Sequence, residues 1–580
     1  MMTKEMFRLN KYYYVDDSVL RSHREYPPLT QIWQYMWCKL IGIFKESSLY
    51  NAKLTLCLSV MLSVVGRIID PELLDSTFNN WELHICKRNK NGIMSKIERA
   101  IEFVFVKTFQ SIPISLLVIV LAAFPTLADG SMYRTIYAEG TMVILTVYTI
   151  ICVLFPVNDK TSDLITYSVT ISSLVLVKQI GILFAAISVL ILAIIYIETR
   201  ILLNRSGATK IIKYSDVSKD ILVKMSVGIL SAFIPWFIWN RVSKIHTTAG
   251  QFDSSRFSVA GIMDVIHGGG TPAQYQCIND YSHALFTWKL TWIPGTGYIV
   301  QTIVLLIALF SVFIYKKRKA EQSVRKMDCD MGQERTIDLG AVSALIIALL
   351  LTVIGYGGIM QVLYLFGFSE DEMRVLACYT RYMNSMLGIW ELVVTFVLFS
   401  TVLAIKVGCS TDADGSNTFL KSLNNKNTLT PRVCAMAIII YVFLIGISGL
   451  KYEFMPGVFT TGSEGLFASD AKKIRDYTPE ESSVYFVDTM GNDSATNIVR
   501  FLADGRNISE FYVAPKASDY ENVVRYMREF EYIYLDNIDD EFISTYGGLF
   551  DGEHELSRQQ MYKIDSDGDA MILSYMDMSE

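Results

Sequence analysis

The chain has 580 residues, of which 51% are hydrophobic, with a mean hydropathy of +0.32 and a net charge of −6 at neutral pH. The apolar residues come in blocks of helix length, and a helix needs roughly 20 of them to cross a bilayer. This composition excludes an ordinary soluble protein of this size. It predicts a polytopic α-helical membrane protein.

Residues 1–52 are polar and aromatic and precede the first apolar block. The stretch 29–44 predicts an interfacial helix, because tryptophan and tyrosine prefer the headgroup region of a bilayer. Tyr26, Pro27 and Pro28 stand directly before it. Proline restricts its own φ angle and the residue before it, so these three residues predict a rigid, extended or kinked entry into that helix.

About ten transmembrane spans are predicted within residues 53–450. They cover residues 54–69, 110–128, 141–157, 163–178, 180–198, 221–240, 297–315, 339–366, 385–407 and 433–450. An even number of spans puts both termini on one side. The loops on the other side hold more Lys and Arg, including the run Lys316, Lys317, Arg318 and Lys319. Such loops are cytoplasmic, so both termini are predicted to be extracytoplasmic.

An outside N-terminus needs a signal peptide or an earlier helix, and residues 1–52 show neither. Two interpretations follow. Either a first transmembrane helix is missing upstream of Met1, or the short span at 54–69 is wrong and the N-terminus is inside.

Residues 451–580 contain more than twice as many acidic as basic residues and none of the nine cysteines. A tail of this charge is not expected to bind nucleic acid. Strands and helices are predicted to alternate at residues 484–488, 495–503, 510–513, 520–529 and 532–536, with a hairpin over 561–575. The order β-α-β-α-β predicts a small extracytoplasmic α/β domain with a parallel core.

Polar residues that could carry chemistry gather at the predicted outer ends of the spans. Carboxylates there suit a general base or a metal ligand, and basic side chains suit a phosphate. The acidic candidates are Asp16, Asp17 and Glu139, and the basic and aromatic candidates are Arg134, Lys178, Arg381 and Tyr382.

Each candidate also has a structural interpretation. Lys178 interrupts an apolar run, and a lysine at a hairpin turn can extend its amine to the membrane surface without binding anything. Arg381 and Tyr382 could be a solvated arginine beside an interfacial tyrosine. Asp16, Asp17 and Glu139 could be ordinary solvated loop carboxylates.

Metal and nucleotide motifs are absent from the sequence. Asp565, Asp567 and Asp569 surround Gly568 with spacing that superficially resembles a calcium loop, but no downstream Glu completes it, and a hairpin turn is the better interpretation. No phosphate-binding glycine loop, zinc motif or nucleophile elbow occurs. The sequence leaves open whether a divalent metal takes part.

Several short motifs together resemble a known family. They are Lys4 to Tyr13 leading into Asp16-Asp17, Tyr26 to Thr30, Lys178-Gln-Ile-Gly181 and Arg381-Tyr382, followed by the terminal outer α/β domain. In these features, over essentially its whole length, the chain resembles the GT-C superfamily of polytopic glycosyltransferases, in the form found in Gram-positive bacteria.

The resemblance implies an enzyme of the bacterial plasma membrane that moves a sugar from a polyprenyl-phosphate carrier to an envelope glycan or polymer on the outer face. Asp16, Asp17 and Glu139 would be catalytic, and Lys178, Arg381, Tyr382 and Arg134 would bind the donor phosphate. In the family a first helix precedes an acidic catalytic motif, and this chain starts beyond that point. A truncated or inactive copy is therefore a further interpretation.

Two other functions stay open. The first is a transporter or flippase of lipid-linked glycans, and the second is a non-catalytic envelope protein. A transporter typically shows ionisable groups near the middle of the membrane and inverted repeats. The candidate charges lie at the outer ends and no internal repeat is visible, which favours the enzyme.

Overall fold

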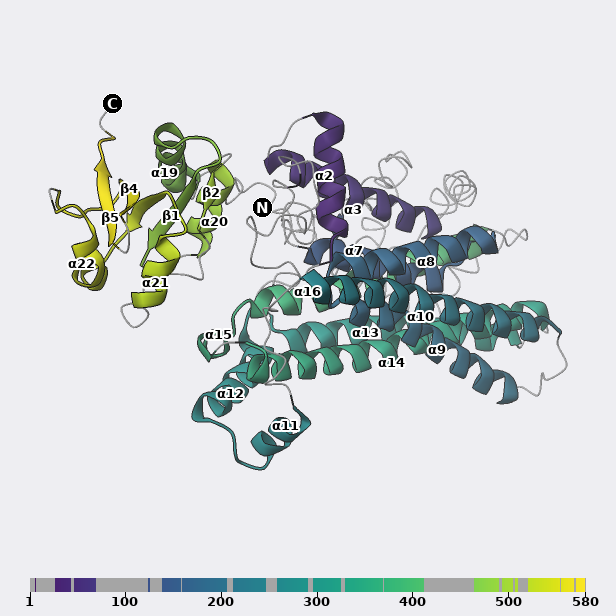
Figure 1. Cartoon of the computed structure of the whole chain (residues 1–580). Helices are drawn as coiled ribbons and strands as arrows, with labels where there is room; N and C mark the ends of the chain where they lie inside the picture. The colour runs from purple at the N-terminus through teal and green to yellow at the C-terminus, as the bar shows by residue number, and fades with distance from the viewer. Residues whose placement is uncertain are drawn as a thin grey trace, which may run out of the picture. The chain divides into compact units, whose positions relative to one another are not determined.

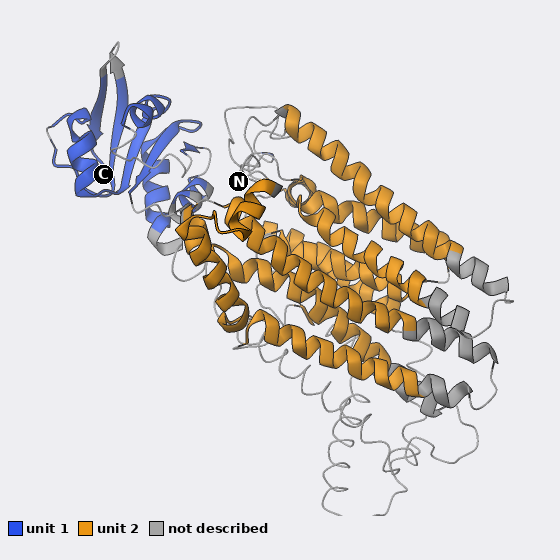
Figure 2. Cartoon of the chain, turned by 90° about the horizontal axis from the view of Figure 1, so that it is seen from below, with its two compact units in different colours: residues 1–22, 455–580 blue, residues 23–454 orange. Residues whose placement is uncertain are grey.

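The computed structural model describes residues 27–42, 46–68, 138–157, 159–205, 212–246, 258–290, 296–324, 329–368, 370–410, 464–489, 493–503, 506–509, 520–552, 554–567 and 570–578, together with residue 6 and residues 124–125. The chain divides into two compact units, residues 23–454 and residues 1–22 with 455–580 (Figure 2).

The first unit is a bundle of long helices (Figure 1). They are α2 (Leu29–Ile41), α3 (Glu46–Ile68), α7 (Glu139–Leu154), α8 (Lys160–Val177), α9 (Gly181–Arg205), α10 (Ile212–His246), α13 (Tyr298–Val324), α14 (Cys329–Phe366) and α16 (Tyr379–Ser410). Three further helices lie in the connections: α11 (Val259–Ile266), α12 (Pro272–Thr287) and α15 (Glu370–Arg374).

Among the described residues, six helices are long and apolar enough to cross a bilayer: α3, α9, α10, α13, α14 and α16. The chain is therefore a multi-pass membrane protein. Each span predicted between residues 54 and 407 coincides with a helix where the structure describes it. The spans predicted at 110–128 and 433–450 lie outside the described residues, apart from residues 124–125, so the total of ten stays a prediction.

Burial separates the centre of the bundle from its edge. In α16, 83% of the most apolar 18-residue window within Tyr379–Thr401 is buried, whereas in α10 only 11% of the corresponding window within Lys219–Ile245 is buried. A helix that is apolar all round is suited to a buried position or to lipid contact. Packing against α7, α13 and α14 places α16 in the interior, and α10 presents most of its apolar surface outward.

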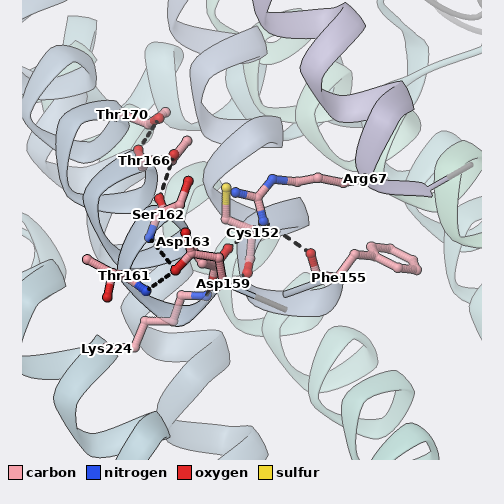
Figure 3. A network of polar contacts seen from close by, with 10 residues as sticks. All are labelled: Arg67, Cys152, Phe155, Asp159, Thr161, Ser162, Asp163, Thr166, Thr170 and Lys224. Atoms are coloured by element: carbon pink, nitrogen blue, oxygen red, sulfur yellow. Dashed lines mark hydrogen bonds and ion pairs between the residues drawn. The ribbon is translucent and has the colours of Figure 1, made fainter. Parts of the chain in front are cut away.

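Local sequence signals fix where two of the helices begin. The Asp159 side chain accepts hydrogen bonds from the backbone N–H groups of Thr161 and Ser162, which otherwise lack partners at a helix start (Figure 3). Thr271 and Gln274 form a reciprocal capping box at the start of α12. Both starts are therefore encoded by the residues immediately before the helix.

A buried ion network ties four helices together at one end of the bundle (Figure 3). The Asp163 carboxylate on α8 accepts hydrogen bonds from Arg67 on α3, at 2.5 Å, and from Lys224 on α10. Arg67 also donates to the carbonyl of Phe155 at 3.2 Å, and Lys224 donates to the carbonyl of Cys152 at 2.7 Å. Cations at the C-terminal end of α7 and a carboxylate in the first turn of α8 both complement the helix dipoles. We call Arg67, Asp163 and Lys224 the inner network.

The second unit contains a five-stranded sheet in the order β2-β1-β3-β4-β5. The strands β1 (Ser483–Asp488), β2 (Asn507–Ile508) and β3 (Tyr532–Asn537) are parallel, and β4 (Gln560–Asp567) and β5 (Ala570–Met576) form an antiparallel hairpin. The helices are α19 (Glu464–Tyr477), α20 (Asp493–Leu502), α21 (Tyr520–Met527) and α22 (Asp540–Tyr546).

The sheet carries a hydrophobic core on each face. Successive side chains of a strand point to opposite faces, so Val484 and Phe486 lie in a core with residues of α19 and α20. Tyr485 and Val487 lie in the other core with residues of α21 and α22. The predicted helices and hairpin are seen, and the strand predicted at 510–513 lies outside the described residues.

A carboxylate in this unit makes its stability depend on pH. Burial, together with Asp470 and Asp488, raises the pKa of Asp536 to about 6. An unfolded aspartate titrates near 4, so between about pH 4 and pH 6 the folded state holds a proton that the unfolded state has lost. The free energy of unfolding therefore falls as the pH rises through this window.

We expect Asp536→Asn to stabilise the α/β unit at neutral pH by about 2 kcal/mol and to remove this pH dependence. Hydrogen exchange of the β1 and β3 amides in the full chain, compared with the unsubstituted protein at each pH, measures the effect. Asp476→Asn, on the exposed side of α19, is the control and should change nothing. Equal protection of the Asp536→Asn variant and the unsubstituted chain at about pH 7 would contradict the expectation.

Candidate functional site

Four residues singled out in the sequence meet at the other end of the bundle from the inner network. Lys178 Nζ donates to Glu139 Oε1 at 2.7 Å, and Arg381 Nε lies 3.4 Å from the same oxygen. The Tyr382 ring faces both cations, with its centroid 5.6 Å from Lys178 Nζ and 4.9 Å from Arg381 Cζ. Arg381 Nη2 also donates to Tyr382 Oη at 3.0 Å. We call Glu139, Lys178, Arg381 and Tyr382 the outer cluster, after the side of the membrane that the sequence predicts for them.

The alternating direction of the helices brings the outer cluster together. Glu139 is the first residue of α7, Lys178 directly follows the last residue of α8, and Arg381 lies in the first turn of α16. Helix α7 packs against both α8 and α16. Because α8 runs antiparallel to α7, the end of α8 lies beside the start of α7, where Lys178 reaches Glu139.

A tight turn fixes the position of Lys178. The backbone N–H of Gly181 donates to the Lys178 carbonyl at 2.8 Å, which closes the connection between α8 and α9. A Cβ atom at Gly181 would lie 2.2 Å from the Leu174 carbonyl oxygen. Only glycine therefore allows α9 to start this close to the end of α8.

We expect Gly181→Ala to destabilise the chain by about 1–3 kcal/mol, because backbone atoms must move to admit the methyl group. The midpoint of thermal unfolding of the full chain in detergent measures this. Gly66→Ala on α3 is the matched control, since no described atom lies within 4 Å of a Cβ built there. Equal midpoints for the two variants would contradict the steric argument.

The start of α16 is held in a strained backbone conformation beside Arg381. Leu376 and Cys378 have φ angles of 47° and 60°, which non-glycine residues adopt at a cost in free energy. Tyr364 Oη donates to the carbonyl of Ala377 at 2.7 Å, and Tyr356 Oη donates to the carbonyl of Tyr382 at 3.2 Å. Two tyrosines of α14 thus fix the segment that carries Arg381.

Packed aromatic rings connect the outer cluster to α12. Ring centroids lie 6.3 Å apart for Phe368 and Tyr382, and 4.8 Å apart for Tyr364 and Phe368. Tyr281 of α12 is 5.9 Å from Tyr364 and 5.7 Å from Tyr379. Such contacts have preferred geometries, so the connection between α10 and α13 is positioned against the cluster through α12.

The charges of the outer cluster suit an anion. Lys178, Arg381 and Glu139 together carry a net charge of +1, and their side chains are 17%, 31% and 10% exposed. Hydrogen bonds from Lys or Arg to a phosphate or carboxylate are strong, and strongest where water is largely excluded. In the part of the chain that the structure describes, no group of three His, Cys, Asp or Glu side chains could hold a metal ion.

The structure does not test most of the remaining candidates from the sequence. Asp16, Asp17, Tyr26 and Arg134 lie outside the described residues. Pro27 and Pro28 directly precede α2, and the Pro28 carbonyl accepts from the backbone N–H of Ile32 at 2.9 Å. The catalytic roles of Asp16 and Asp17, the phosphate-binding role of Arg134 and the structural role of Tyr26 stay predictions.

Sequence reasoning missed a buried cation near the start of α7. Lys53 on α3 is 2% exposed and lies one turn before Cys57. The Cys57 thiol is 3.8 Å from the hydroxyl of Thr141, two residues after Glu139. The predicted first span began at Leu54, which left Lys53 outside it. Extending the helix by one turn would have shown a lysine on the packed face.

Comparisons with known proteins give only distant similarity. No protein-family model and no curated protein matches the chain. A solved structure of the oligosaccharyltransferase AglB of Archaeoglobus fulgidus, in complex with an inhibitory peptide and a dolichol-phosphate, is 10% identical with a TM-score of 0.42. The apo form of the Archaeoglobus fulgidus oligosaccharyltransferase has 10% identity and a TM-score of 0.41.

Both alignments cover 92% of this chain and 64% of the archaeal protein, so the chain spans less than two-thirds of the length of the proteins it matches. Similarity at this level carries no argument about activity. The function of the chain is inferred from its own residues.

Proposed function

We propose that the chain is a GT-C-type glycosyltransferase that takes a sugar from a polyprenyl-phosphate carrier at the outer face of a bacterial plasma membrane. The observation that carries this proposal is the outer cluster. Two cations from different helices share one largely buried carboxylate at the end of a membrane-spanning bundle. The resemblance of the sequence motifs supplies the class of reaction.

The outer cluster has the charge and location that a carrier phosphate needs. A lipid-linked donor keeps its tail in the bilayer and its phosphate at headgroup depth, where the ends of α7, α8 and α16 meet. As the bond between the sugar and the phosphate oxygen breaks, negative charge grows on the departing phosphate. Lys178 and Arg381 stabilise that charge more in the transition state than in the bound donor, which lowers the barrier.

In this proposal Glu139 positions the two cations. Its Oε1 atom already accepts from Lys178 and lies beside Arg381, so it orients the ammonium and the guanidinium toward one phosphate. The proton of the acceptor hydroxyl goes to a carboxylate other than Glu139, a role for which the sequence predicts Asp16 or Asp17. The acceptor oxygen bonds to the anomeric carbon, and the electron pair of the broken bond stays on the phosphate.

A transfer assay tests the proposal. Full-length protein in proteoliposomes is given a radiolabelled polyprenyl-phosphate hexose together with a cell-envelope glycan fraction. We expect labelled sugar to appear in the glycan and free polyprenyl phosphate to accumulate, with both lost in Arg381→Met. Donor that stays intact, while the lipid moves between the two leaflets, would contradict a transferase.

One observation favours the transporter as the second candidate. Glu391 lies well inside α16 and is 0% exposed. An acidic residue in the middle of a span is typical of ion-coupled transport. In that case Glu391→Gln should stop transbilayer movement of a fluorescent lipid-linked glycan, whereas a transferase should keep its donor binding in this variant.

A further inference from the structure

An apolar groove lies between α11 and α14. Its volume is about 400 Å³, and its walls are formed by Ile262 of α11 and by Gly355, Gly358, Ile359, Val362 and Leu363 of α14. Every side chain in this lining is a hydrocarbon or a hydrogen atom. Because these side chains form no hydrogen bonds with water, the groove is suited to bind an apolar group.

The two glycines keep the floor of the groove open. No described atom lies within 4 Å of a Cβ built at Gly355 or at Gly358. Neither glycine is therefore required by packing against the described residues. Glycine inside a helix is less favourable than alanine. Two glycines on one face of α14 are explained if they leave room for a molecule other than the chain itself.

The groove is continuous with the surface that α14 presents to lipid. Leu351, Ile354 and Ile359 are 54%, 71% and 41% exposed within the candidate span Gly340–Phe366. In a bilayer, such an apolar surface is in contact with lipid acyl chains. The same hydrocarbon phase therefore extends into the groove.

The groove lies within the membrane-spanning length of α14. Gly355 precedes Phe366, the last residue of α14, by about three helical turns, or roughly 16 Å. Helix α11 lies beside the end of α14, because a Cβ built at Gly261 would be 3.5 Å from the Phe366 ring, and Ile262 of α11 lines the groove from there. Eight residues are too few to span a bilayer, and the exposed Ile266 of α11 is apolar.

Hydrogen bonds hold α11 in this place. Tyr275 Oη on α12 donates to the carbonyl of Val265 at 3.0 Å. Gln274 Nε2, also on α12, donates to the carbonyl of Leu365 at 3.3 Å. Helix α12 therefore links α11 to the outer end of α14.

The groove and the outer cluster are on different faces of α14. Tyr356, next to Gly355, is 2% exposed, and its hydroxyl donates to the Tyr382 carbonyl at 3.2 Å. Gly355 and Gly358 open toward α11 instead. A carrier lipid whose phosphate is at Lys178 does not need this groove.

We propose that α11 lies at the surface of the outer leaflet and that the groove between α11 and α14 binds an acyl chain of a bilayer phospholipid. The bound chain anchors α11 and, through Tyr275 and α12, the connection that packs against the outer cluster. This binding does not depend on whether the outer cluster transfers a sugar.

Photolabelling tests the proposal. The full-length protein is placed in vesicles of phosphatidylethanolamine and phosphatidylglycerol with a trace of phosphatidylethanolamine that carries a diazirine in the middle of one acyl chain. After irradiation, mass spectrometry should find label on the peptides that contain Ile262 and Val362. In the double variant Gly355→Leu/Gly358→Leu we expect roughly tenfold less label there, the ratio produced by losing contact with about two methylene groups.

The double variant should fold, because leucine favours a helix more than glycine does and no described atom blocks either side chain. Its thermal unfolding midpoint checks this. Gly66→Leu is the matched control, a helical glycine on α3 with similar open space and no groove, and should leave the labelling unchanged. Equal labelling of the double variant and the unsubstituted chain would overturn the proposal. So would displacement of the label by added polyprenyl phosphate, which would assign the groove to the carrier.

Discussion

Lys178→Met is expected to weaken binding of a polyprenyl-phosphate sugar by roughly a hundredfold, the effect of truncating one partner of a desolvated, hydrogen-bonded charge pair. The substitution removes the ammonium group that lies 2.7 Å from Glu139 Oε1 and lowers the net charge of the outer cluster from +1 to zero. A phosphate then meets Arg381 alone, with the Glu139 carboxylate repelling it. Equilibrium binding of a radiolabelled donor to the full chain in nanodiscs measures the change.

Two further variants show whether the effect belongs to the site. Lys160→Met is the control, because Lys160 pairs with Asp220 at the other end of α8 and its side chain is 74% exposed. Its donor affinity should match that of the unsubstituted chain. Lys178→Arg keeps the charge and should recover much of the affinity. If Lys178→Met binds the donor normally while keeping its unfolding midpoint, Lys178 is a structural partner of Glu139 and binds no phosphate.

Hydropathy located the described helices well, because the bilayer imposes a length on each apolar run. It located their ends less well. Helix α3 begins at Glu46 and α14 begins at Cys329, several residues before the predicted spans at 54–69 and 339–366. A helix does not stop where the hydrocarbon stops, since its backbone hydrogen bonds continue through polar residues at the surface. The length of an apolar segment therefore indicates the thickness of the bilayer and not the full length of the helix.

The outer cluster could be predicted as a set of residues but not as a contact. Lys178 stood out because it interrupts an apolar run, and Arg381 with Tyr382 because they precede a span. Alternating helix directions place these residues on the same face together with Glu139. Which helices pack against one another depends on side-chain fit between α7, α8 and α16, and a single sequence carries no readable signal for that.

The inner network was missed although its charges are visible in the sequence. Lys224 lies inside the predicted span 221–240, and Asp163 is the first residue of the predicted span 163–178. Charges inside spans are costly unless they pair, so an acid and a base in neighbouring spans predict a contact between them. Arg67, near the inner end of the first span, is the third member by the same argument.

Asp163→Asn is expected to lower the free energy of unfolding by about 3–5 kcal/mol, the range measured when one partner of a buried ion pair is removed. Asparagine keeps the shape of the side chain, but it leaves Arg67 and Lys224 side by side with no carboxylate between them. Their side chains are 7% and 11% exposed, so water cannot take over its role. Unfolding of the full chain in mixed micelles with increasing SDS measures the loss.

A solvent-exposed ion pair serves as the control that shows how much of the expected loss in stability is due to burial. Glu370 and Arg374 form an ion pair on α15 with side chains 61% and 52% exposed. Glu370→Gln should cost at most about 1 kcal/mol, because solvent already screens that pair. Equal losses for Glu370→Gln and Asp163→Asn would show that the inner network contributes no more than a surface ion pair.

A triple variant distinguishes two contributions to the free energy of unfolding. One is the cost of burying charges that have lost their partner, and the other is the net stabilisation by the intact network. Replacing a whole buried ion cluster by apolar residues is often neutral or stabilising. Arg67→Met, Asp163→Leu and Lys224→Met together should therefore be more stable than Asp163→Asn alone. The recovery should be incomplete, because the carbonyls of Phe155 and Cys152 lose the two cations that donate to them. Those carbonyls lie at the C-terminal end of α7, and Glu139 of the outer cluster lies at its start. The stability that the triple variant does not recover therefore measures how much the inner network stabilises the position of α7.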